Sequence, residues 1–467
     1  MTKFADELFA DLMREHGQEL EILDRPLPQE AIGPLTARPR LPRPLTGHPR
    51  RPRRQPAWLA PTAAATGVIL AVGLAVVLGG RVHHGRHAAR VTDSRAETAY
   101  LLDAIQGTVT PISPVTGKLG TPVRVGPRGS VIGHGKRRLR ASRIAQDLIL
   151  PDGTTNYALY ARGRGKGETE VLRRTSLVTG AAGPPIQVGR PQSVVITPDG
   201  RTAYLNYIGT HQSTVRPVSL ATGTVGKPIL RAPTALAPWI TLTMAPDGRT
   251  VYVPYARAGT IIPISTATNI PGRPIAVPGT WGPVMFTRDG RTAFVIGRRK
   301  GVGETLTPIS TATNTPGRAI IIEPSAGQLI VAPDGKTVYA IDFPGTSVTP
   351  ISTRTGRAGK PILLHGGRGA SDMVITPDGR TLYAAGQGWV TPVSLATGTV
   401  GKSLTVPGAP LNLVITPDGR TVYASNATVG ELQLVTPIST ATGAAGKPIR
   451  TSAPTIEVLV PGAQNAA

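Results

Sequence analysis

The chain has 467 residues, with 51 basic against 27 acidic side chains and a formal net charge of +24. Its 55 glycines and 46 prolines exclude a helical bundle or a coiled coil as the main architecture, and a hydrophobic content of 40% is too high for wholesale disorder. Because there is no cysteine, disulfides, thiolate nucleophiles and cysteine-ligated zinc or iron–sulfur sites are excluded as well.

Residues 1–30 are acidic and carry apolar side chains at helical spacing, among them Phe4, Leu8 and Leu12. This pattern predicts one short amphipathic cytoplasmic helix, too small to be a stable domain by itself. It either docks on a cytoplasmic partner or is a solubilising tail. Residues 31–56 are rich in proline and arginine and predict a stiff basic linker that can lie on anionic lipid headgroups.

Residues 57–80 form an uncharged apolar segment that would span roughly 36 Å as a helix, at about 1.5 Å per residue. Seven arginines precede this segment in the linker, whereas Arg81, Arg86 and Arg90 follow it at the start of a second linker, 81–96, which favours an N-terminus in the cytoplasm. We therefore predict an uncleaved signal-anchor and a single-pass protein whose remaining chain is extracytoplasmic. The alternative is a cleaved signal peptide.

Past residue 95 the sequence repeats. A Pro-Asp-Gly turn, replaced once by Arg-Asp-Gly, recurs seven times from Asp152 to Asp418 at intervals of 40 to 48 residues, and a Thr-Pro-Ile-Ser-like run recurs eight times from Ser113 to Ser439. Each unit predicts four short strands: one entering the Asp-Gly turn, one leaving it, the Thr-Pro-Ile-Ser run, and the Gly-Lys-Pro-Ile run. Four strands in each repeat of 40–50 residues are typical of a β-propeller blade.

The repeat region opens in the middle of a unit, since Thr98–Asp103 matches a second strand and Thr455–Gly462 matches a first strand. Pairing of these two segments would close the ring and remove exposed sheet edges. We therefore expect an all-β fold: a β-propeller of four-stranded blades over residues 97–462, with eight blades counted and seven as the alternative. One transmembrane helix precedes it, and a tail at 463–467 follows.

Two stretches allow a comparison with known repeats. They are Ile-Thr-Pro-Asp-Gly-Arg-Thr-Ala-Tyr at 196–204 and Pro-Ile-Ser-Thr-Ala-Thr-Asn-Thr-Pro at 308–316. The unit resembles the YVTN-type β-propeller repeat of the lactonase-like propeller superfamily. The chain departs from this family's pattern in two ways. The asparagine after the second strand is clear only at Asn426, and eight blades are counted where seven are usual. Propellers of this family serve as binding surfaces and occasionally as enzymes, so the resemblance by itself implies no single function. No lactonase-type catalytic residue can be carried over to this sequence.

In such a blade the first–second and third–fourth turns share one face, and their near-identical residues are explained by turn geometry. We therefore interpret the turn aspartates and the repeated serines as scaffold. The other face differs between units and is basic, which suits an anionic ligand or polymer, although these loops could equally be ordinary solvated surface. The candidate binding residues are Arg162, Arg164, Lys166, Arg298, Arg299, Lys300, Trp239 and Trp281, with both tryptophans expected in links before first strands.

Few features of the sequence indicate a catalytic site. The ring contains His134, His211 and His365, each in a different unit, and the last two could converge with Asp103, Glu304 or Asp342 on the variable face. We find no metal-ligand spacing, nucleophile elbow or dinucleotide fingerprint, so we predict no cofactor and no metal.

The sequence thus favours a non-enzymatic role: a membrane-anchored, extracytoplasmic propeller that binds a protein partner or an anionic cell-envelope polymer rather than nucleic acid. One alternative is a lactonase-like small-molecule hydrolase at the mouth of the channel, which requires an acid or base near the axis. The other is an envelope sensor that signals through the N-terminal cytoplasmic helix.

Overall fold

The computed structural model describes the repeat region with short gaps. The described residues are 98–113, 117–132, 139–141, 144–162, 169–210, 212–233, 241–299, 303–322, 326–342, 345–364, 369–408, 410, 412–426, 434–451 and 456–461. The predictions for residues 1–96, including the membrane helix at 57–80, and for the tail at 463–467 lie outside these ranges. Within the described ranges, no helix is long and apolar enough to cross a bilayer.

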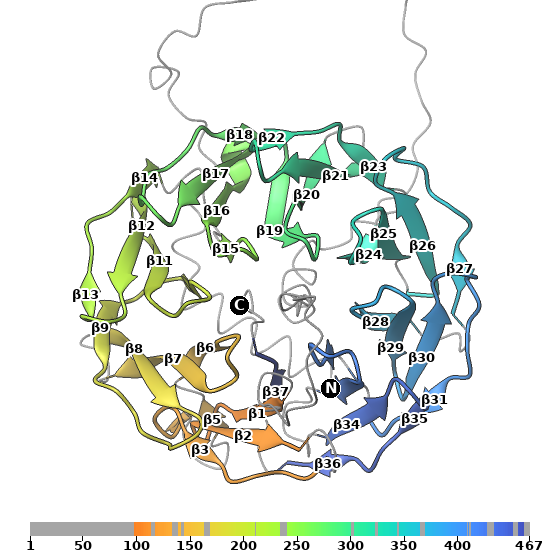
Figure 1. The fold of residues 1–467 in the computed structure, drawn as a ribbon, viewed down its shortest axis with the longest axis horizontal. Coiled ribbons are helices and arrows are strands. Elements are labelled where there is room, and N and C mark those ends of the chain that lie inside the picture. The colour runs from red at the N-terminus through yellow and green to blue at the C-terminus, as the bar shows by residue number, and fades with distance from the viewer. Residues whose placement is uncertain are drawn as a thin grey trace, which may run out of the picture. The chain divides into compact units, whose positions relative to one another are not determined.

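Eight antiparallel sheets form a closed ring of blades around a central axis (Figure 1), which confirms eight blades and excludes seven. The first strand of each blade lies nearest the axis and the last lies at the rim. Blade 1 contains β37 (Ile456–Leu459), β1 (Ala99–Asp103), β2 (Thr108–Ile112) and β3 (Val123–Arg124). Blade 2 contains β6 (Ile144–Ile149), β7 (Thr155–Arg162), β8 (Thr169–Ser176) and β9 (Ile186–Gly189).

The next three blades follow in chain order. Blade 3 contains β10 (Ser193–Ile196), β11 (Thr202–Ile208), β12 (Gln212–Ser219), β13 (Thr224–Val225) and β14 (Leu230–Pro233). Blade 4 contains β15 (Thr243–Met244), β16 (Thr250–Tyr255), the 3₁₀ turn η7 (Ala256–Ala258), β17 (Thr260–Ser265) and β18 (Ile275–Ala276). Blade 5 contains β19 (Thr280–Phe286), β20 (Thr292–Arg299), β21 (Gly303–Ser310), β22 (Thr315–Pro316) and β23 (Ile320–Ile322).

The last three blades complete the ring. Blade 6 contains β24 (Ala326–Val331), β25 (Thr337–Asp342), β26 (Ser347–Ser352) and β27 (Ile362–Leu363). Blade 7 contains β28 (Ala370–Ile375), β29 (Thr381–Gly386), β30 (Trp389–Ser394) and β31 (Leu404–Thr405). Blade 8 contains β32 (Asn412–Ile415), β33 (Thr421–Ser425), β34 (Leu434–Ser439), β35 (Ala444–Ala445) and β36 (Ile449–Arg450).

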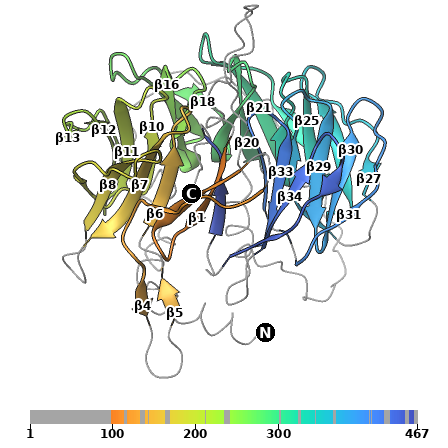
Figure 2. The ribbon, with the colours of Figure 1, turned by 60° about the horizontal axis from the view of Figure 1, so that its bottom comes forward.

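Blade 1 closes the ring as the sequence predicts. The C-terminal strand β37 pairs antiparallel with β1, from Tyr100 opposite Leu459 to Asp103 opposite Ile456, and Figure 1 shows the two strands side by side. The irregular link before blade 2 forms a separate hairpin of β4 (Ser130–Ile132) and β5 (Leu139–Ala141), which projects away from the blades (Figure 2).

The fourth strands differ from the prediction, because the Gly-Lys-Pro-Ile run marks a break in the strand. In blade 3 this run, 226–229, lies between β13 and β14. Pro217 in the third strand has no N–H to donate to the ladder, whereas its carbonyl accepts a 2.7 Å hydrogen bond from Gly226 N. A Cβ at position 226 would lie 3.0 Å from the Pro217 ring, which explains the glycine.

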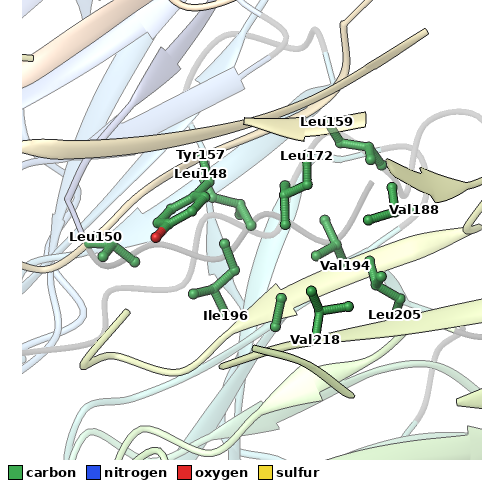
Figure 3. Close-up of a cluster of buried hydrophobic side chains, with 11 residues drawn as sticks. Leu148, Leu150, Tyr157, Leu159, Leu172, Val188, Val194, Ile196, Leu205 and Val218 are labelled. Carbon is green, nitrogen blue, oxygen red and sulfur yellow. The ribbon is translucent and has the colours of Figure 1, made fainter. Parts of the chain in front are cut away.

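The core is divided among the eight seams between adjacent blades, each filled by its own cluster of buried side chains. Figure 3 shows the seam between blades 2 and 3, where Leu148 and Leu172 pack against Val194 and Leu205. At roughly 25 cal/mol per Å² of apolar surface removed from water, these seams supply the main stabilisation of the ring.

Candidate functional site

The described basic candidates of the variable face lie on two blades that are not neighbours. Arg162 is exposed at the end of β7 in blade 2. Arg298, near the end of β20 in blade 5, pairs with Glu304 across a 2.9 Å contact between Nη2 and Oε1, and the Glu304 side chain is only 5% exposed. Arg298 therefore neutralises a buried carboxylate. Because blades 3 and 4 lie between the two arginines, the structure does not bring them into one cluster.

The remaining candidates are only partly placed. Arg299 lies in β20 and Trp281 in β19, whereas Arg164, Lys166, Lys300 and Trp239 fall outside the described residues. The prediction that Trp281 lies in a link was wrong, because β19 already begins at Thr280. A register shift between Thr280 and Val284 lets the strand continue past Pro283, which has no N–H for the ladder.

The carboxylates proposed to meet a histidine are bound by their own loops. Asp103 accepts a 2.7 Å hydrogen bond from Gln106 N, and Asp342 accepts one of 2.6 Å from Ser347 N. Glu304 is paired with Arg298. His134, His211 and His365 lie outside the described residues.

The repeated turns share one face, as predicted from the blade topology. In blade 3 the Arg201 carbonyl of the first–second turn accepts a 2.9 Å hydrogen bond from Leu220 N of the third–fourth turn, and the same contact recurs in blades 4 to 8. Asp199 accepts hydrogen bonds from the Thr197 hydroxyl at 2.5 Å and Arg201 N at 3.0 Å. These contacts support the structural role predicted for the turn aspartates.

The same contacts set the charge of the Asp199 carboxyl. Partial burial alone would raise its pKa. The hydrogen bonds from Thr197 and Arg201 N and the nearby Arg201 guanidinium outweigh that burial and lower the pKa below its ordinary value of 3.8. The turn aspartates of blades 5 and 7 are shifted in the same direction. The aspartates therefore remain charged at neutral pH.

Two rings of exposed cations surround these turns in blades 3 to 8. The inner ring follows each Asp-Gly pair and consists of Arg201, Arg249, Arg291, Lys336, Arg380 and Arg420. The outer ring follows the glycine of the broken fourth strand and consists of Lys227, Arg273, Arg318, Lys360, Lys402 and Lys447. We call these twelve residues the basic annulus.

The annulus has a surplus of positive charge. In three blades the inner cation approaches its turn aspartate at 3.7–3.9 Å while remaining 81–88% exposed, and such surface pairs contribute little. The outer cations lie in segments without any acidic residue. The twelve cations of the annulus therefore face six turn aspartates, an excess of six positive charges within this set.

Turn geometry does not require these cations. It explains the aspartate and the glycine, but blade 2 forms the same turns with Thr154 and Pro184 at the corresponding positions. The annulus was not predicted, because the repeated turns were interpreted wholly as scaffold. The available signal was the recurrence of Lys or Arg directly after glycine twice in each unit.

Two seams carry shallow grooves, one of them within the annulus. The groove between blades 6 and 7 has a volume of about 520 Å³ and is lined by residues that include Asp334, Tyr339, Asp378 and Arg380 of the inner ring. A second groove of about 400 Å³ lies between blades 1 and 2 and includes Lys118. The repeated-turn face thus combines positive charge with concave surface.

A second polar layer lies along the innermost strands, and the sequence analysis did not identify it. Near the start of a first strand, one side chain binds the backbone of the next blade. Gln146 bonds both N and O of Val194, at 3.1 and 3.0 Å, and Ser193 accepts a 3.3 Å bond from Leu242 N. These contacts hold neighbouring blades in register.

Asp372 occupies the same layer in blade 7. It is fully buried and accepts hydrogen bonds from Gln328 Nε2 at 2.5 Å, Met373 N at 2.8 Å and Leu413 N at 2.6 Å. Burial raises the pKa of its carboxyl to about 7, against the lowering effect of these three donors. Asp372 is therefore a well-satisfied structural acid.

Two further acids lie at the seam between blades 1 and 2. Asp147 is 4% exposed, and burial together with the nearby Glu457 raises the pKa of its carboxyl to about 8. Glu457, on the innermost strand β37, is exposed, yet the surrounding strands desolvate its carboxyl and raise its pKa to about 7. Among the described residues, no group of three or more His, Asp or Glu could hold a metal ion.

No protein-family model matches the sequence, and no curated protein is similar to it in sequence. Solved propeller structures do resemble its fold. The dihydro-heme d1 dehydrogenase NirN, in complex with DHE, aligns with a TM-score of 0.59 at 14% identity over 88% of this chain and 83% of NirN. Hydrazine synthase from Kuenenia stuttgartiensis aligns with a TM-score of 0.42 at 19% identity over 66% of this chain and 96% of that chain. At 14% identity the likeness to NirN shows the propeller fold alone.

Proposed function

We propose that this protein is an extracytoplasmic binding propeller, anchored by residues 57–80, that holds an anionic cell-envelope polymer on its repeated-turn face. The observation that carries the proposal is the basic annulus: twelve exposed cations at equivalent positions of six consecutive blades. Charges spread over a broad face suit an extended polyanion or an anionic surface rather than one small anion. The YVTN-type repeat and the membrane anchor remain predictions from the sequence.

Binding to dextran sulfate, with uncharged dextran as the matched polymer, tests the proposal. The full chain in detergent should be retained by dextran sulfate alone, and less so at 1 M salt, where the Debye length falls to about 3 Å. Replacing Lys360, Lys402 and Lys447 by Gln should weaken binding roughly 100-fold, at about 1 kcal/mol for each cation near an anionic surface.

The opposite face supplies the control. The variant Arg299→Gln/Lys300→Gln neutralises the predicted second–third loop of blade 5 but keeps Arg298, whose removal would leave the buried Glu304 without its ion pair. We expect this variant to bind as the wild type does. Loss of binding in the control variant alone would place the ligand on the variable face, and equal retention by dextran and dextran sulfate would refute the proposal.

One observation favours the hydrolase alternative, which needs an acid or base near the axis. Glu457 is exposed on an innermost strand, and its raised pKa suits proton transfer near neutral pH. A screen of lactones and esters, with Glu457→Gln as the inactive control, tests this second candidate. Turnover that survives in the variant would exclude Glu457 as the catalytic group.

A further inference from the structure

The seam between blades 1 and 2, where the ring closes, contains polar groups at positions that are apolar elsewhere. By strand register, Asp147 and Asn156 of blade 2 correspond to Val194 and Ala203 of blade 3. Both side chains are turned toward blade 1, on the face of the sheet that packs into its apolar cluster through Ile149. Polar residues buried in this way cost free energy unless each polar atom has a partner.

Two of these atoms have no partner. Asn156 Nδ2 donates to Asp147 Oδ1 at 2.5 Å, but Asp147 Oδ2 and Asn156 Oδ1 are both buried and neither has a hydrogen-bond donor. Asp147 is 4% exposed and Asn156 is not exposed at all. Both orphan atoms are acceptors. The Thr175 hydroxyl, opposite Asn156 in the strand register, is also buried without a partner and offers a single donor, so the seam has one donor too few for the two oxygens.

We propose that a single proton supplies this donor, so that Asp147 is a neutral acid that donates from Oδ2 to Asn156 Oδ1 and the pair holds blade 2 against the closing strand β37. One proton satisfies both orphan oxygens at once and needs no additional space in a packed seam. A hard metal cation would also meet oxygen ligands, but it would require room and further ligands.

Few charged or titratable groups face the seam. Glu457 on β37 acts on Asp147 as a second negative charge. The other described ones on this face are Tyr100 on β1, Tyr160 on β7 and the half-buried Arg173 on β8, which donates to the Gly183 carbonyl at 3.0 Å. When Asp147 loses its proton to the water that reaches Glu457, a charged carboxylate is left buried beside a second one. This weakens the hold of β37, which is paired with the rest of blade 1 only through β1.

The sign of the pH dependence follows from the raised pKa values. The unfolded acids lose their protons near pH 4, whereas the folded acids keep theirs until about pH 7 to 8. The folded state therefore binds more protons in this window, and stability falls as pH rises from about 4 to about 8. Turn aspartates with lowered pKa values, such as Asp199, act in the opposite sense but only below about pH 4.

Hydrogen exchange on the full chain at pH 6.0 and 8.5, corrected for intrinsic rates, tests the proposal. Protection of residues 456–461 should fall roughly tenfold at the higher pH, while residues 193–196 of blade 3 stay unchanged. Asp147→Asn should keep that protection at pH 8.5, because the amide group at position 147 donates a hydrogen bond to Asn156 Oδ1 at any pH. Glu457→Gln, a change at an exposed position, should keep part of this protection at pH 8.5, because it removes the second negative charge beside Asp147.

Asp372→Asn is the matched control, since it replaces an acid of the same inner layer that has its own three donors. It should leave the pH response of β37 intact. An unchanged wild-type profile, or an equal pH response in Asp147→Asn, would refute the proposal. A metal cation is the remaining possibility. If calcium chloride restored the protection of residues 456–461 at pH 8.5 in the wild type but not in Asp147→Asn, the bound species would be a metal cation and the proposal would be refuted.

Discussion

Blades 2 and 3 are neighbours with the same strand order, yet they differ at several positions that the repeat otherwise keeps. Blade 3 presents Val194 and Ala203 to its preceding neighbour, whereas blade 2 presents Asp147 and Asn156. Blade 2 also has Arg174 where blade 3 has Pro217 in the third strand. The exceptions are concentrated in the blade that packs against the closing blade. A repeat can depart from its pattern where its neighbour is not an ordinary copy.

The difference between the two seams gives the largest expected effect. Asp147→Val combined with Asn156→Ala makes the seam of blade 2 resemble that of blade 3. At pH 8.5 the free energy of unfolding should rise by about 1–4 kcal/mol, because an incompletely satisfied buried polar pair is replaced by apolar contacts. Urea unfolding measures this gain, which should shrink at pH 5. A loss of stability at both pH values would show that the polar pair is itself stabilising.

The third-strand proline gives a smaller contrast. A Cβ at Gly226 would lie 3.0 Å from the Pro217 ring, whereas in blade 2 a Cβ at Gly183 would lie 3.8 Å from the nearest atoms of Arg174. We expect Gly226→Ala to cost about 1–2 kcal/mol through overpacking. Gly183→Ala should change stability by less than about 0.5 kcal/mol. If thermal unfolding showed the same loss of stability for Gly226→Ala and Gly183→Ala, contact with the Pro217 ring would not be the reason for glycine at position 226.

Inter-blade tyrosines give the smallest contrast. The hydroxyl of Tyr204 in blade 3 donates to Asn269 Oδ1 at 2.7 Å, whereas that of Tyr157 in blade 2 lies 3.5 Å from the Gly200 carbonyl. Tyr204→Phe should cost about 1 kcal/mol, and Tyr157→Phe should cost less than half as much, since its hydrogen bond is long. Denaturant midpoints compare the two variants, and a larger loss in Tyr157→Phe would reverse the ranking.

The repeat period predicted most of the fold. The intervals between the turn aspartates and the match of Thr98–Asp103 to a second strand led to eight blades closed by the C-terminal segment, both of which are confirmed. The break in the fourth strand was missed, although its signal is present. A proline in the third strand cannot donate to the ladder, and the glycine of the Gly-Lys-Pro-Ile run is the residue that can approach it closely.

The candidate site was predicted less well. The basic annulus could have been found from the sequence, since its cations follow glycine at two fixed positions in each unit. The pairing of Arg298 with Glu304 could also have been expected from their places in one hairpin. By contrast, nothing in the sequence near Asp147 indicates that Glu457, more than 300 residues away, acts on its carboxyl.

By itself, the sequence determined the strand order, the number of blades and the turn chemistry, because each depends on residues close together in the chain. Only the tertiary structure decided which acids meet and which polar atoms lack partners. Asp372 and Asp147 lie in equivalent strands and are both buried, but both carboxyl oxygens of the first accept hydrogen bonds, whereas Oδ2 of the second has no donor. Their difference arises from the blades packed beside them, and closure of the ring brings together the two ends of the chain.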